Sequence, residues 1–511
     1  MAAFGVHFGT CSACLAVYRD GKTDIVANDL GDRVTPCVVA FTDHDQSVGA
    51  AAKQGVIRNA SNTVRYVKRL LGHKFSSTVV QDVVEKSPVK IVEKDGVPVY
   101  EVSHMGKTKQ VSMTCIAETI YRKMLETAQS HGGRGIQDAV LTVPVGFTPE
   151  QRNAISDAAH KAGFNILRVV SEAAAAVLAY DLGQLNHAEN STVLVYRFGG
   201  TSTEATMIKV ENGLYRVCAS FTDPNFGADE YTRVLCDYLV TEFKRQFRCD
   251  VRENKRAMIK LWLAAEVCKH TMSNLGNAHC TIDSLHDGID YHQTISRARF
   301  ESLCSSLLQQ NTRIIDQCLS ESNLQKEDIN KVILCGGGSK VPILQKAISD
   351  CLPGAELLNS IPADEVIAIG AAKEAAILVG KEIEELKEHE NYLEAKCLSK
   401  SIYVKCVGQT CHSDSDCSSH QCCSSNGGSM LLHVLRATTA ATCVSKSGVN
   451  EQCPLNGAPS GFVHSCGCQP NLVCYVRPSG MMPSFGRCIT HEQHQKELEW
   501  VRNNPWVYML P

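Results

Sequence analysis

The stretch VLVYRFGGTSTEATMIKV, residues 193–210, constrains the fold most, because two apolar runs flank a tight turn that contains two glycines. Val193–Tyr196 predicts a buried strand, and Thr206–Val210 predicts the strand that returns from the turn. Gly199 and Gly200 let the backbone approach a ligand and direct several N–H groups at one point, as an anionic phosphate requires. By itself, this pattern is more typical of an ordinary hairpin than of a phosphate site.

Two more glycine turns give the first one weight. The run GVHFGT (5–10) lies near the beginning of the chain, and VILCGGGS (332–339) lies near the end of the same long segment. Strands around a glycine turn, followed by helices interleaved with strands, occur once before Glu189 and once after it. This repeated order predicts an α/β fold of two similar lobes, with ligands binding in the cleft between them.

Local patterns place the individual elements. Strands are predicted at 138–144, 166–170 and 331–334, and helices at 112–130, 148–162, 172–182, 229–247, 255–275, 300–321, from 342 onward and at 363–379. The run TPEQ (148–151) is typical of a helix start, with Thr at the cap and Gln at the third position. A further helix is predicted over 61–71, capped by Ser61 or Asn62. The charged run 381–390 predicts a solvated helix or a linker.

Composition argues against several kinds of function. With 511 residues, the chain is too long for one core and needs several domains. Its net charge is −3 and it has no large basic tract, so a broad nucleic-acid-binding face is not expected. The first residues lack the basic and apolar regions of a secretory signal, and no apolar run reaches the ~20 residues that a membrane crossing needs. The N-terminal part is therefore expected in the cytosol.

The glycine turns belong to a longer series of motifs that resembles the seventy-kilodalton heat-shock chaperone family over about residues 3–400. Other matching runs are NTVRYVKRLLG (62–72), VLTVPVGF (140–147), VSEAAAAVLAY (170–180), FGADEY (226–231), AEVCKHTMS (265–273) and PADEVIAIGAA (362–372). The resemblance implies an actin-like, two-lobed nucleotide-binding fold and a role in protein folding and the stress response. It is greatest to an atypical cytosolic branch of the family, whose members work with a J-domain co-chaperone at the ribosome.

The resemblance also implies roles for individual residues. ATP would be bound by Gly9, Thr10, Cys11, Arg197, Gly199, Gly200, Thr201, Ser202, Gly227, Glu266, Lys269, His270, Ser273, Gly336, Gly337, Gly338, Lys340 and Asp364. Lys68 falls on the family's catalytic lysine, and Glu172 falls on a carboxylate at the metal side of the phosphates.

Three substitutions depart from the family's pattern around the phosphates, two of them at the metal. The family has acidic residues where this chain has His7 and Arg197, and a threonine where it has Cys11. Magnesium requires oxygen ligands in near-octahedral geometry, which imidazole and guanidinium groups do not supply. We therefore expect ATP binding without a metal site, and hydrolysis that is weak or lost although Lys68 and Glu172 remain. Arg197 is expected to take over the charge of the metal.

The resemblance ends shortly after the second lobe. In the family, a leucine-rich linker leads into a β-sandwich that binds peptides. Here the linker is absent, and only Tyr392–Lys405 resembles the first strand of that sandwich. We therefore predict a nucleotide-binding domain at 1–385, a linker with a remnant strand at 386–410, a cysteine-rich domain at 411–490 and a tail at 491–511. No peptide-binding groove is expected.

Ten of the 25 cysteines are concentrated in residues 411–488. The number is even, the paired C-x2-C units of metal sites do not occur, and large apolar residues are few, so disulfides are expected. The runs DSDCSSHQCC (414–423) and CGCQPNLVC (466–474) resemble the prokineticin, astakine and colipase-like fold, although Dickkopf-type proteins share related patterns. That resemblance implies a small disulfide-rich β domain with the pairs Cys411–Cys423, Cys417–Cys443, Cys422–Cys466, Cys453–Cys474 and Cys468–Cys488.

The two parts require opposite redox compartments, so the chain is either an unusual fusion or two neighbouring genes joined. The sequence favours an ATP-binding chaperone homologue that docks its partner in a ribosome-associated, cotranslational folding complex. One alternative is an active ATP-dependent chaperone, which magnesium-dependent turnover would reveal. The other is a secreted prokineticin-like ligand acting through the tail, which five disulfides in a secretory compartment would reveal.

Overall fold

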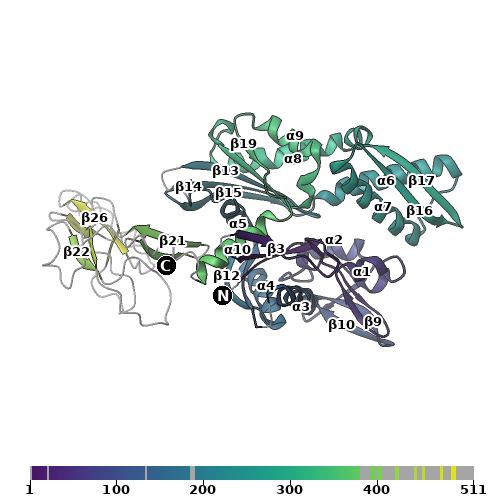
Figure 1. Cartoon of the computed structure of the whole chain (residues 1–511), viewed down its shortest axis with the longest axis horizontal. Coiled ribbons are helices and arrows are strands. Elements are labelled where there is room, and N and C mark those ends of the chain that lie inside the picture. Colours follow the sequence, from purple (N-terminus) through teal and green to yellow (C-terminus); the bar gives the residue numbers. More distant parts are fainter. Residues whose placement is uncertain are drawn as a thin grey trace, which may run out of the picture. The chain divides into compact units, whose positions relative to one another are not determined.

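The computed structural model describes residues 3–19, 22–132, 135–184 and 190–379, together with seven short strands further along the chain. The chain divides into two compact units, residues 1–383 and 384–511. The first unit consists of two lobes with two helices between them (Figure 1). None of the helices in the described ranges has the length and apolar character that a membrane crossing requires.

A sheet of mixed strand direction forms the centre of lobe I, defined here as residues 3–184. Its strands are β1 (Phe4–Phe8), β2 (Ser12–Arg19), β3 (Lys22–Ile25), β11 (Asp138–Val143) and β12 (Asn165–Ser171), with β4 (Thr35–Pro36) beside β2. The strand order is β12-β11-β1-β2-β3. Strands β1, β11 and β12 are parallel, whereas β1, β2 and β3 alternate in direction.

Lobe II, residues 190–365, contains a second sheet of the same kind. Its strands are β13 (Ser191–Phe198), β14 (Thr203–Glu211), β15 (Leu214–Asp223), β18 (Lys331–Cys335) and β19 (Glu356–Leu358). The order is β15-β14-β13-β18-β19, in which β13, β18 and β19 are parallel and β13, β14 and β15 alternate. Because the second sheet repeats the topology of the first, the prediction of two similar α/β lobes is confirmed.

Helices cover the sheets and join the lobes. Lobe I has α1 (Ala50–Gly55), α2 (Thr78–Lys86), α3 (Met113–Gly132) and α4 (Pro149–Ala162), and lobe II has α6 (Ala228–Phe247), α7 (Lys255–Asn274), α8 (Arg297–Ser322) and α9 (Pro342–Cys351). Two central helices, α5 (Glu172–Ala179) and α10 (Val366–Leu378), share one apolar core with strands of both sheets. Gly370 permits this packing, because a Cβ there would lie 1.7 Å from the carbonyl oxygen of Ala175.

Smaller elements extend both lobes. For most of these segments, the sequence patterns predict neither a helix nor a strand. Lobe I adds a sheet of β5 (Val39–Phe41), β6 (Gln46–Val48) and β7 (Thr63–Val64), and a meander of β8 (Lys90–Lys94), β9 (Val97–His104) and β10 (Lys107–Ser112). Lobe II adds the hairpin of β16 (Asn277–His286) and β17 (Ile289–Ser296). Short 3-10 helices are η1 (Ala60–Asn62), η2 (Val67–Arg69), η3 (Lys326–Asp328) and η4 (Gly337–Lys340).

The start of α4 confirms the capping box that the sequence predicts. The hydroxyl of Thr148 accepts a hydrogen bond from the amide of Gln151 at 3.3 Å. In return, the side-chain oxygen of Gln151 accepts one from the amide of Thr148 at 3.0 Å. These two bonds satisfy backbone donors that the first helical turn leaves free, and they fix where the helix begins.

The helix predicted over 61–71 is wrong, because η1, β7 and η2 occupy this segment. Thr63 and Val64 pair with β5, which draws the backbone into an extended conformation. Tyr66 then adopts φ 60° and ψ 25°, in the left-handed region, where a right-handed helix cannot continue. Tertiary pairing with a neighbouring strand therefore overrides the local helical pattern.

Beyond residue 383, the backbone of seven strands is described. The segment 392–405, predicted as one strand, forms the antiparallel hairpin of β20 (Tyr392–Cys397) and β21 (Lys400–Lys405). Further along are β22 (Gln421–Ser424), β23 (Thr442–Ser445), β24 (Gln452–Pro454), β25 (Leu472–Tyr475) and β26 (Phe485–Thr490). The predicted disulfides lie outside the residues whose side chains are described, and so does the run 381–390.

Candidate functional site

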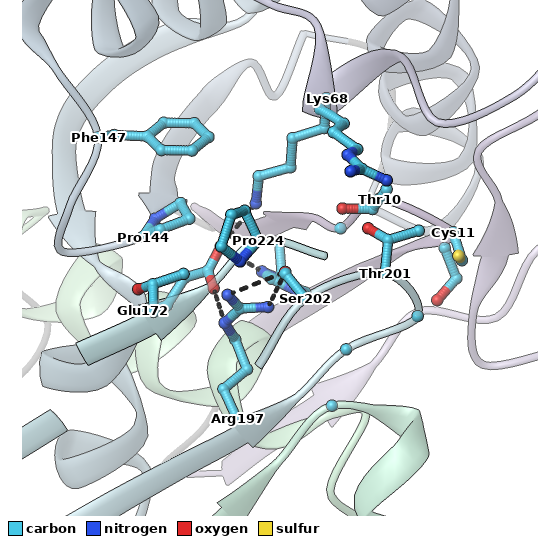
Figure 2. A pocket seen from close by; sticks show the side chains of 18 of the residues that line it. Thr10, Cys11, Lys68, Pro144, Phe147, Glu172, Arg197, Thr201, Ser202 and Pro224 are labelled. Carbon is cyan, nitrogen blue, oxygen red and sulfur yellow. Dashed lines mark hydrogen bonds and ion pairs between the residues drawn. The ribbon is translucent and has the colours of Figure 1, made fainter. Parts of the chain in front are cut away.

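A cavity of about 260 Å³ is lined by residues of both lobes, and all three glycine turns contribute to it (Figure 2). The predicted ATP ligands that line it are Gly9, Thr10, Cys11, Arg197, Gly199, Gly200, Thr201, Ser202, Gly336, Gly337 and Asp364. Lys68, Glu172 and His7 line it as well. The fold therefore brings together the turns and the charged residues that the sequence analysis connects with phosphate.

The two lobes present equivalent turns to the cavity. Between β1 and β2, the amide of Gly9 donates a hydrogen bond to the carbonyl of Ser12 at 3.0 Å. Between β13 and β14, the amide of Gly199 donates to the carbonyl of Ser202, also at 3.0 Å. The third turn begins at Gly336, whose φ of 83° and close approach to the backbone of β13 leave no room for a side chain. Turns from both lobes thus line the same cavity.

Lys68 and Glu172 form a buried ion pair at the cavity. The Lys68 Nζ donates to Glu172 Oε1 at 2.6 Å, and their side chains are 6% and 2% exposed. Lys68 belongs to η2, and its ammonium group also lies 5.6 Å from the centre of the Phe147 ring. Glu172 is the first residue of α5, which Ser171 caps by accepting a hydrogen bond from the amide of Ala174. The pair thus joins a short segment of lobe I to a central helix.

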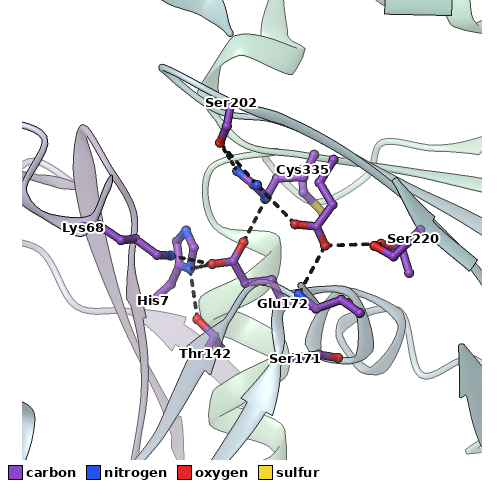
Figure 3. Close-up of polar contacts among 12 residues, drawn as sticks. His7, Lys68, Thr142, Ser171, Glu172, Ser202, Ser220 and Cys335 are labelled. Carbon is purple, nitrogen blue, oxygen red and sulfur yellow. Dashed lines mark hydrogen bonds and ion pairs between the residues drawn. The ribbon is translucent and has the colours of Figure 1, made fainter. Parts of the chain in front are cut away.

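Figure 3 shows Glu172 with Lys68 and His7 beside it. The guanidinium group of Arg197 lies between the buried carboxylates of Glu172 and Glu204. Its Nε is 3.0 Å from Glu172 Oε2, although the two atoms are not aligned as a hydrogen bond. Its Nη2 donates to Glu204 Oε2 at 3.2 Å, and both terminal nitrogens lie 3.4 Å from the hydroxyl of Ser202. Together with Lys68, Arg197 therefore balances the charges of Glu172 and Glu204.

The two neighbouring cations keep Glu172 ionised. Burial would raise the pKa of this carboxyl group, but the charges of Lys68 and Arg197 outweigh burial and lower the pKa to about 2. A general base works best when its pKa lies near the working pH. Glu172, held by two cations, is therefore a weak base at neutral pH.

His7 is uncharged at neutral pH in this setting. Its Nδ1 lies 3.0 Å from the hydroxyl of Thr142 and 3.9 Å from Glu172 Oε1. Burial lowers the pKa of His7 to about 4; Lys68 and Arg197 act in the same direction, and only Glu172 opposes them. His7 thus contributes neither a carboxylate nor a positive charge to the cavity.

The side chains around Arg197 do not fit a magnesium ion. Magnesium binds oxygen ligands in near-octahedral geometry. His7 offers a ring nitrogen, and Arg197 places a cation among the carboxylates. The oxygens of Glu172 and Glu204 already face Lys68 and Arg197. Within the described ranges, no group of three or more His, Cys, Asp or Glu side chains is placed to hold a metal ion.

Two of the predicted glycines support the turns instead of lining the cavity. A Cβ on Gly227 would lie 2.5 Å from the carbonyl oxygen of Gly200. A Cβ on Gly338 would lie 2.6 Å from the ring of Phe198. Both positions therefore require glycine because another part of the backbone or core packs directly against them.

Four predicted residues on α7 are also outside the lining of this cavity. Glu266 forms an ion pair with Lys53 of lobe I at 2.9 Å. Lys269 is buried, and its Nζ donates to the hydroxyl of Thr232 at 2.7 Å. The hydroxyl of Ser273 donates to the carbonyl of Lys269 at 3.3 Å. Their predicted contacts with a nucleoside stay predictions.

Two further residues with predicted nucleoside contacts are Lys340 and His270. Lys340 of η4 forms an ion pair with Asp364 at 2.6 Å. Burial lowers the pKa of His270 to about 4, and the charges of Lys269 and Lys340 contribute in the same direction. The predicted nucleoside contacts of His270 and Lys340 stay predictions.

The sequence predicts no site role for Glu204, Pro144 and Phe147, which the structure places here. Glu204 lies directly opposite Arg197 in the register of β13 and β14, and facing residues of an antiparallel pair lie on the same side of a sheet. The four-residue turn between them is the signal that indicates this pairing. Pro144 and Phe147, which line the cavity after β11, lie within the motif VLTVPVGF but have no chemistry that a pattern singles out.

Comparison with known families supports the nucleotide-binding interpretation of this cavity. The sequence profile described as Hsp70 protein matches residues 3–404 of this chain. The chain belongs to the Hsp70 family. Hsp70 proteins are chaperones that bind ATP and work with co-chaperones, and the first unit is an Hsp70 nucleotide-binding domain with mixed α/β sheets.

Individual Hsp70 relatives are similar over the same part. Heat shock 70 kDa protein 14 of Danio rerio is 49% identical over 405 residues, which cover 79% of this chain and 80% of the relative. The Homo sapiens protein of that name is 48% identical over 410 residues, covering 80% of each chain. Heat shock 70 kDa protein 14-B of Xenopus laevis is 45% identical over 410 residues, again covering 80% of each.

Proposed function

We propose that this Hsp70-family chain binds ATP without needing magnesium and hydrolyses it very slowly or not at all. The observation that carries the proposal is the position of Arg197 between Glu172 and Glu204. Two carboxylates without a cation would repel the phosphates of ATP. Lys68 and Arg197 neutralise both, so that the four side chains sum to no net charge before a nucleotide enters.

The glycine turns supply the groups that would hold the phosphates. Residues of the turns after β1 and β13 line the cavity, including the hydroxyl-bearing Thr10, Thr201 and Ser202, and turns of this kind can bind anions through their backbone N–H groups. Arg197 adds a planar cation that makes paired hydrogen bonds to phosphate oxygens. A cation ~4 Å from a phosphate oxygen contributes about 4 kcal/mol in a partly screened site, before its desolvation cost is subtracted.

Hydrolysis requires more than charge compensation. Magnesium lends phosphoryl transfer both charge and geometry, and a base or polar group must orient the attacking water. Here neutral His7 stands at one of the family's acidic positions, and Glu172 has a pKa of about 2 because two cations face it. These side chains can bind phosphate and neutralise one another's charges, but neither His7 nor Glu172 accepts a proton readily at neutral pH.

Calorimetry of nucleotide binding, with magnesium and with a chelator, tests this function. We expect the wild-type affinity for ATP to be nearly the same in both conditions. Arg197→Asp should lose at least about tenfold in affinity in chelator and regain it with magnesium, because the substitution removes the cation and restores a ligand. Arg197→Lys is the matched control, since it keeps the charge and should stay independent of the metal.

The same experiments can refute the proposal. A wild-type affinity that collapses in chelator, or an Arg197→Asp variant whose metal dependence is unchanged, contradicts the role of Arg197. Fast, magnesium-dependent ATP turnover by the wild type would favour an active chaperone instead.

We further propose that the chain acts as the docking component of a ribosome-associated, cotranslational folding complex with a J-domain co-chaperone. The similarity to heat shock 70 kDa protein 14 and the absence of a residue set suited to fast hydrolysis in the described cavity support this role. Co-sedimentation with translating ribosomes and co-purification of a J-domain protein from the cytosol are the expected results. Recovery of the chain only from ribosome-free or secretory fractions would contradict it.

A further inference from the structure

Tyr66 has a strained backbone and a side chain that reaches from one lobe to the other. Its φ of 60° is in the left-handed region, which is unfavourable for a residue other than glycine. The Tyr66 hydroxyl donates a hydrogen bond to Asp229 Oδ2 at 2.8 Å. Tyr66 connects β7 and η2 in lobe I, whereas Asp229 is in the first turn of α6 in lobe II.

Asp229 is attached directly to the phosphate-side turn of lobe II. Its amide donates to the carbonyl of Gly200 at 2.8 Å, and the neighbouring amide of Ala228 donates to the carbonyl of Gly199 at 2.9 Å. The partner of Tyr66 is thus anchored to the turn that lines the cavity. The guanidinium group of Arg65 lies 4.8 Å from the centre of the Tyr66 ring and adds a cation–π contact on the lobe I side.

The other end of this connection is Lys68. It follows Tyr66 by two residues on η2, and Tyr66 is the N-cap residue of that short helix. A change in the Tyr66 backbone must therefore move the turn that presents Lys68 to Glu172. The left-handed conformation is retained because the surrounding contacts stabilise it more than the strain costs.

Several other described contacts also join the two lobes, among them the Glu172–Arg197 ion pair, the Arg33–Glu365 ion pair and the hydrogen bond from the amide of Val145 to Glu204. Two more join side chains on either side of the cleft. Lys53 pairs with Glu266 at 2.9 Å, with the Lys53 side chain 38% exposed. Arg69 donates to the side chain of Asn225 in an exposed position. Both involve more exposed side chains than the contact of Tyr66, and among the described residues the backbone of neither lobe II partner is hydrogen-bonded to the Gly199–Ser202 turn.

We propose that the Tyr66–Asp229 hydrogen bond is a latch that holds the two lobes together and positions Lys68 at the phosphates. Tyr66 is a positioning residue in this scheme, because it acts through Lys68 and through the turn at Gly200. With the latch closed, a bound nucleotide leaves slowly. When the Tyr66–Asp229 hydrogen bond is lost, the two lobes separate more often, and the nucleotide dissociates faster. The part concerning nucleotide release rests on the proposed ATP binding.

The latch can be tested in the full chain without any nucleotide. Tyr66→Phe removes the hydroxyl but keeps the ring, and Asp229→Ala removes the acceptor. Amide hydrogen exchange should become faster in both 63–71 and 199–203 in either variant. The double variant should exchange no faster than the single ones, because both remove the same bond. Asp229→Asn keeps an acceptor oxygen and should behave like the wild type.

Nucleotide release provides a second measurement. We expect Tyr66→Phe and Asp229→Ala to raise the dissociation rate of a fluorescent ATP analogue about tenfold, the effect of losing one hydrogen bond to a charged acceptor. Tyr291→Phe is the matched control: the Tyr291 hydroxyl donates to the carbonyl of Leu239 within lobe II, so its loss should leave the rate unchanged.

The outcomes separate the latch from the proposed ATP binding. If no nucleotide binds, the proposed function fails, and the exchange experiment still decides about the latch. Faster exchange confined to the mutated lobe overturns the latch. Additive increases in exchange rate in the double variant would also overturn the latch. An increase in the nucleotide dissociation rate by Tyr291→Phe equal to that of Tyr66→Phe would overturn it as well.

Discussion

At the scale of single residues, the chemistry of the cavity depends on how four buried charges compensate one another. Lys68 and Arg197 face Glu172 and Glu204, and the pKa of Glu172 is lowered to about 2 as a result. Removing one member of such a buried set leaves its partners uncompensated, which costs more than the set contributes as a whole. These residues therefore depend on one another for stability as well as for binding.

The low pKa of His7 predicts a loss of stability in mild acid. A pKa of about 4 in the folded protein, against 6.5 in the unfolded chain, means that the unfolded chain binds more protons between these pH values. The stability contribution is therefore complete above pH 6.5 and is lost as the pH falls toward 4, by about 3 kcal/mol. Glu172 adds a second loss, from pH 4.5 down to its folded pKa of about 2.

Calorimetric unfolding of the first unit at several pH values measures this effect. His7→Asn should flatten the stability curve between pH 6.5 and 4.5 and change little at pH 7.5. His270 also has a pKa lowered to about 4 and contributes in the same range, so His270→Asn should flatten the curve separately. A His7→Asn curve as steep as that of the wild type would show that folding does not lower the pKa of His7.

At this scale, the sequence predicts which residues gather but not how they pair. Arg197 and Glu172 are predictable because the motifs RFGGTS and VSEAAAAVLAY carry them, and both line the cavity. The ion pair between Arg197 and Glu204 depends on the register of β13 and β14, and the turn between these two strands sets that register. Tyr66 was not predictable as a site residue, since its contact with Asp229 spans 163 residues of chain.

At the scale of secondary-structure elements, local signals succeed where nothing competes with them. The capping box of Thr148 fixes the beginning of α4 because both of its hydrogen bonds lie within four residues. The segment 61–71 carries similar helical signals, but pairing of β7 with β5 and the left-handed Tyr66 replace the helix. Backbone pairing with a distant strand cannot be read from an eleven-residue window.

The contact between α5 and α10 predicts an unusually sensitive glycine. Gly370→Ala would place a Cβ 1.7 Å from the carbonyl oxygen of Ala175, so the two central helices must separate. Because they carry the core that both lobes share, we expect a loss of about 3 kcal/mol or more in the free energy of unfolding. Gly354→Ala is the control, since a Cβ there meets no atom within 4 Å. Equal stability of the two variants in thermal unfolding would contradict this packing.

At the scale of the whole molecule, the first unit contains everything that the cavity needs. Both sheets, the central helices and all three glycine turns lie within residues 1–383. We therefore predict that residues 1–385 fold alone and unfold in one cooperative thermal transition. Expression of this fragment and differential scanning calorimetry test the boundary. An insoluble fragment, or one without a cooperative transition, would place part of its core beyond residue 385.

The cysteine-rich tail should depend on its redox state. Ten cysteines lie in 411–488, while the segment has few large apolar residues, so disulfides must replace the stability that a core supplies elsewhere. Each bridge limits the conformations of the unfolded chain, and losing one typically costs about 2–5 kcal/mol in a small domain. A segment that depends on five such bridges should not stay folded when all of them are reduced.

We therefore expect residues 406–490 to resist proteases when they are oxidised and to be digested rapidly after reduction. Thiol counting should find no free cysteine in the resistant form, and peptide mapping should recover the five pairs implied by the prokineticin-like pattern. Reduction of the full chain should leave the first unit intact, because 13 cysteines among its described residues are free thiols. A tail that resists proteases with all ten thiols free would show that a core stabilises it. In that case the chain needs no oxidising compartment, and the cytosol suits both of its parts.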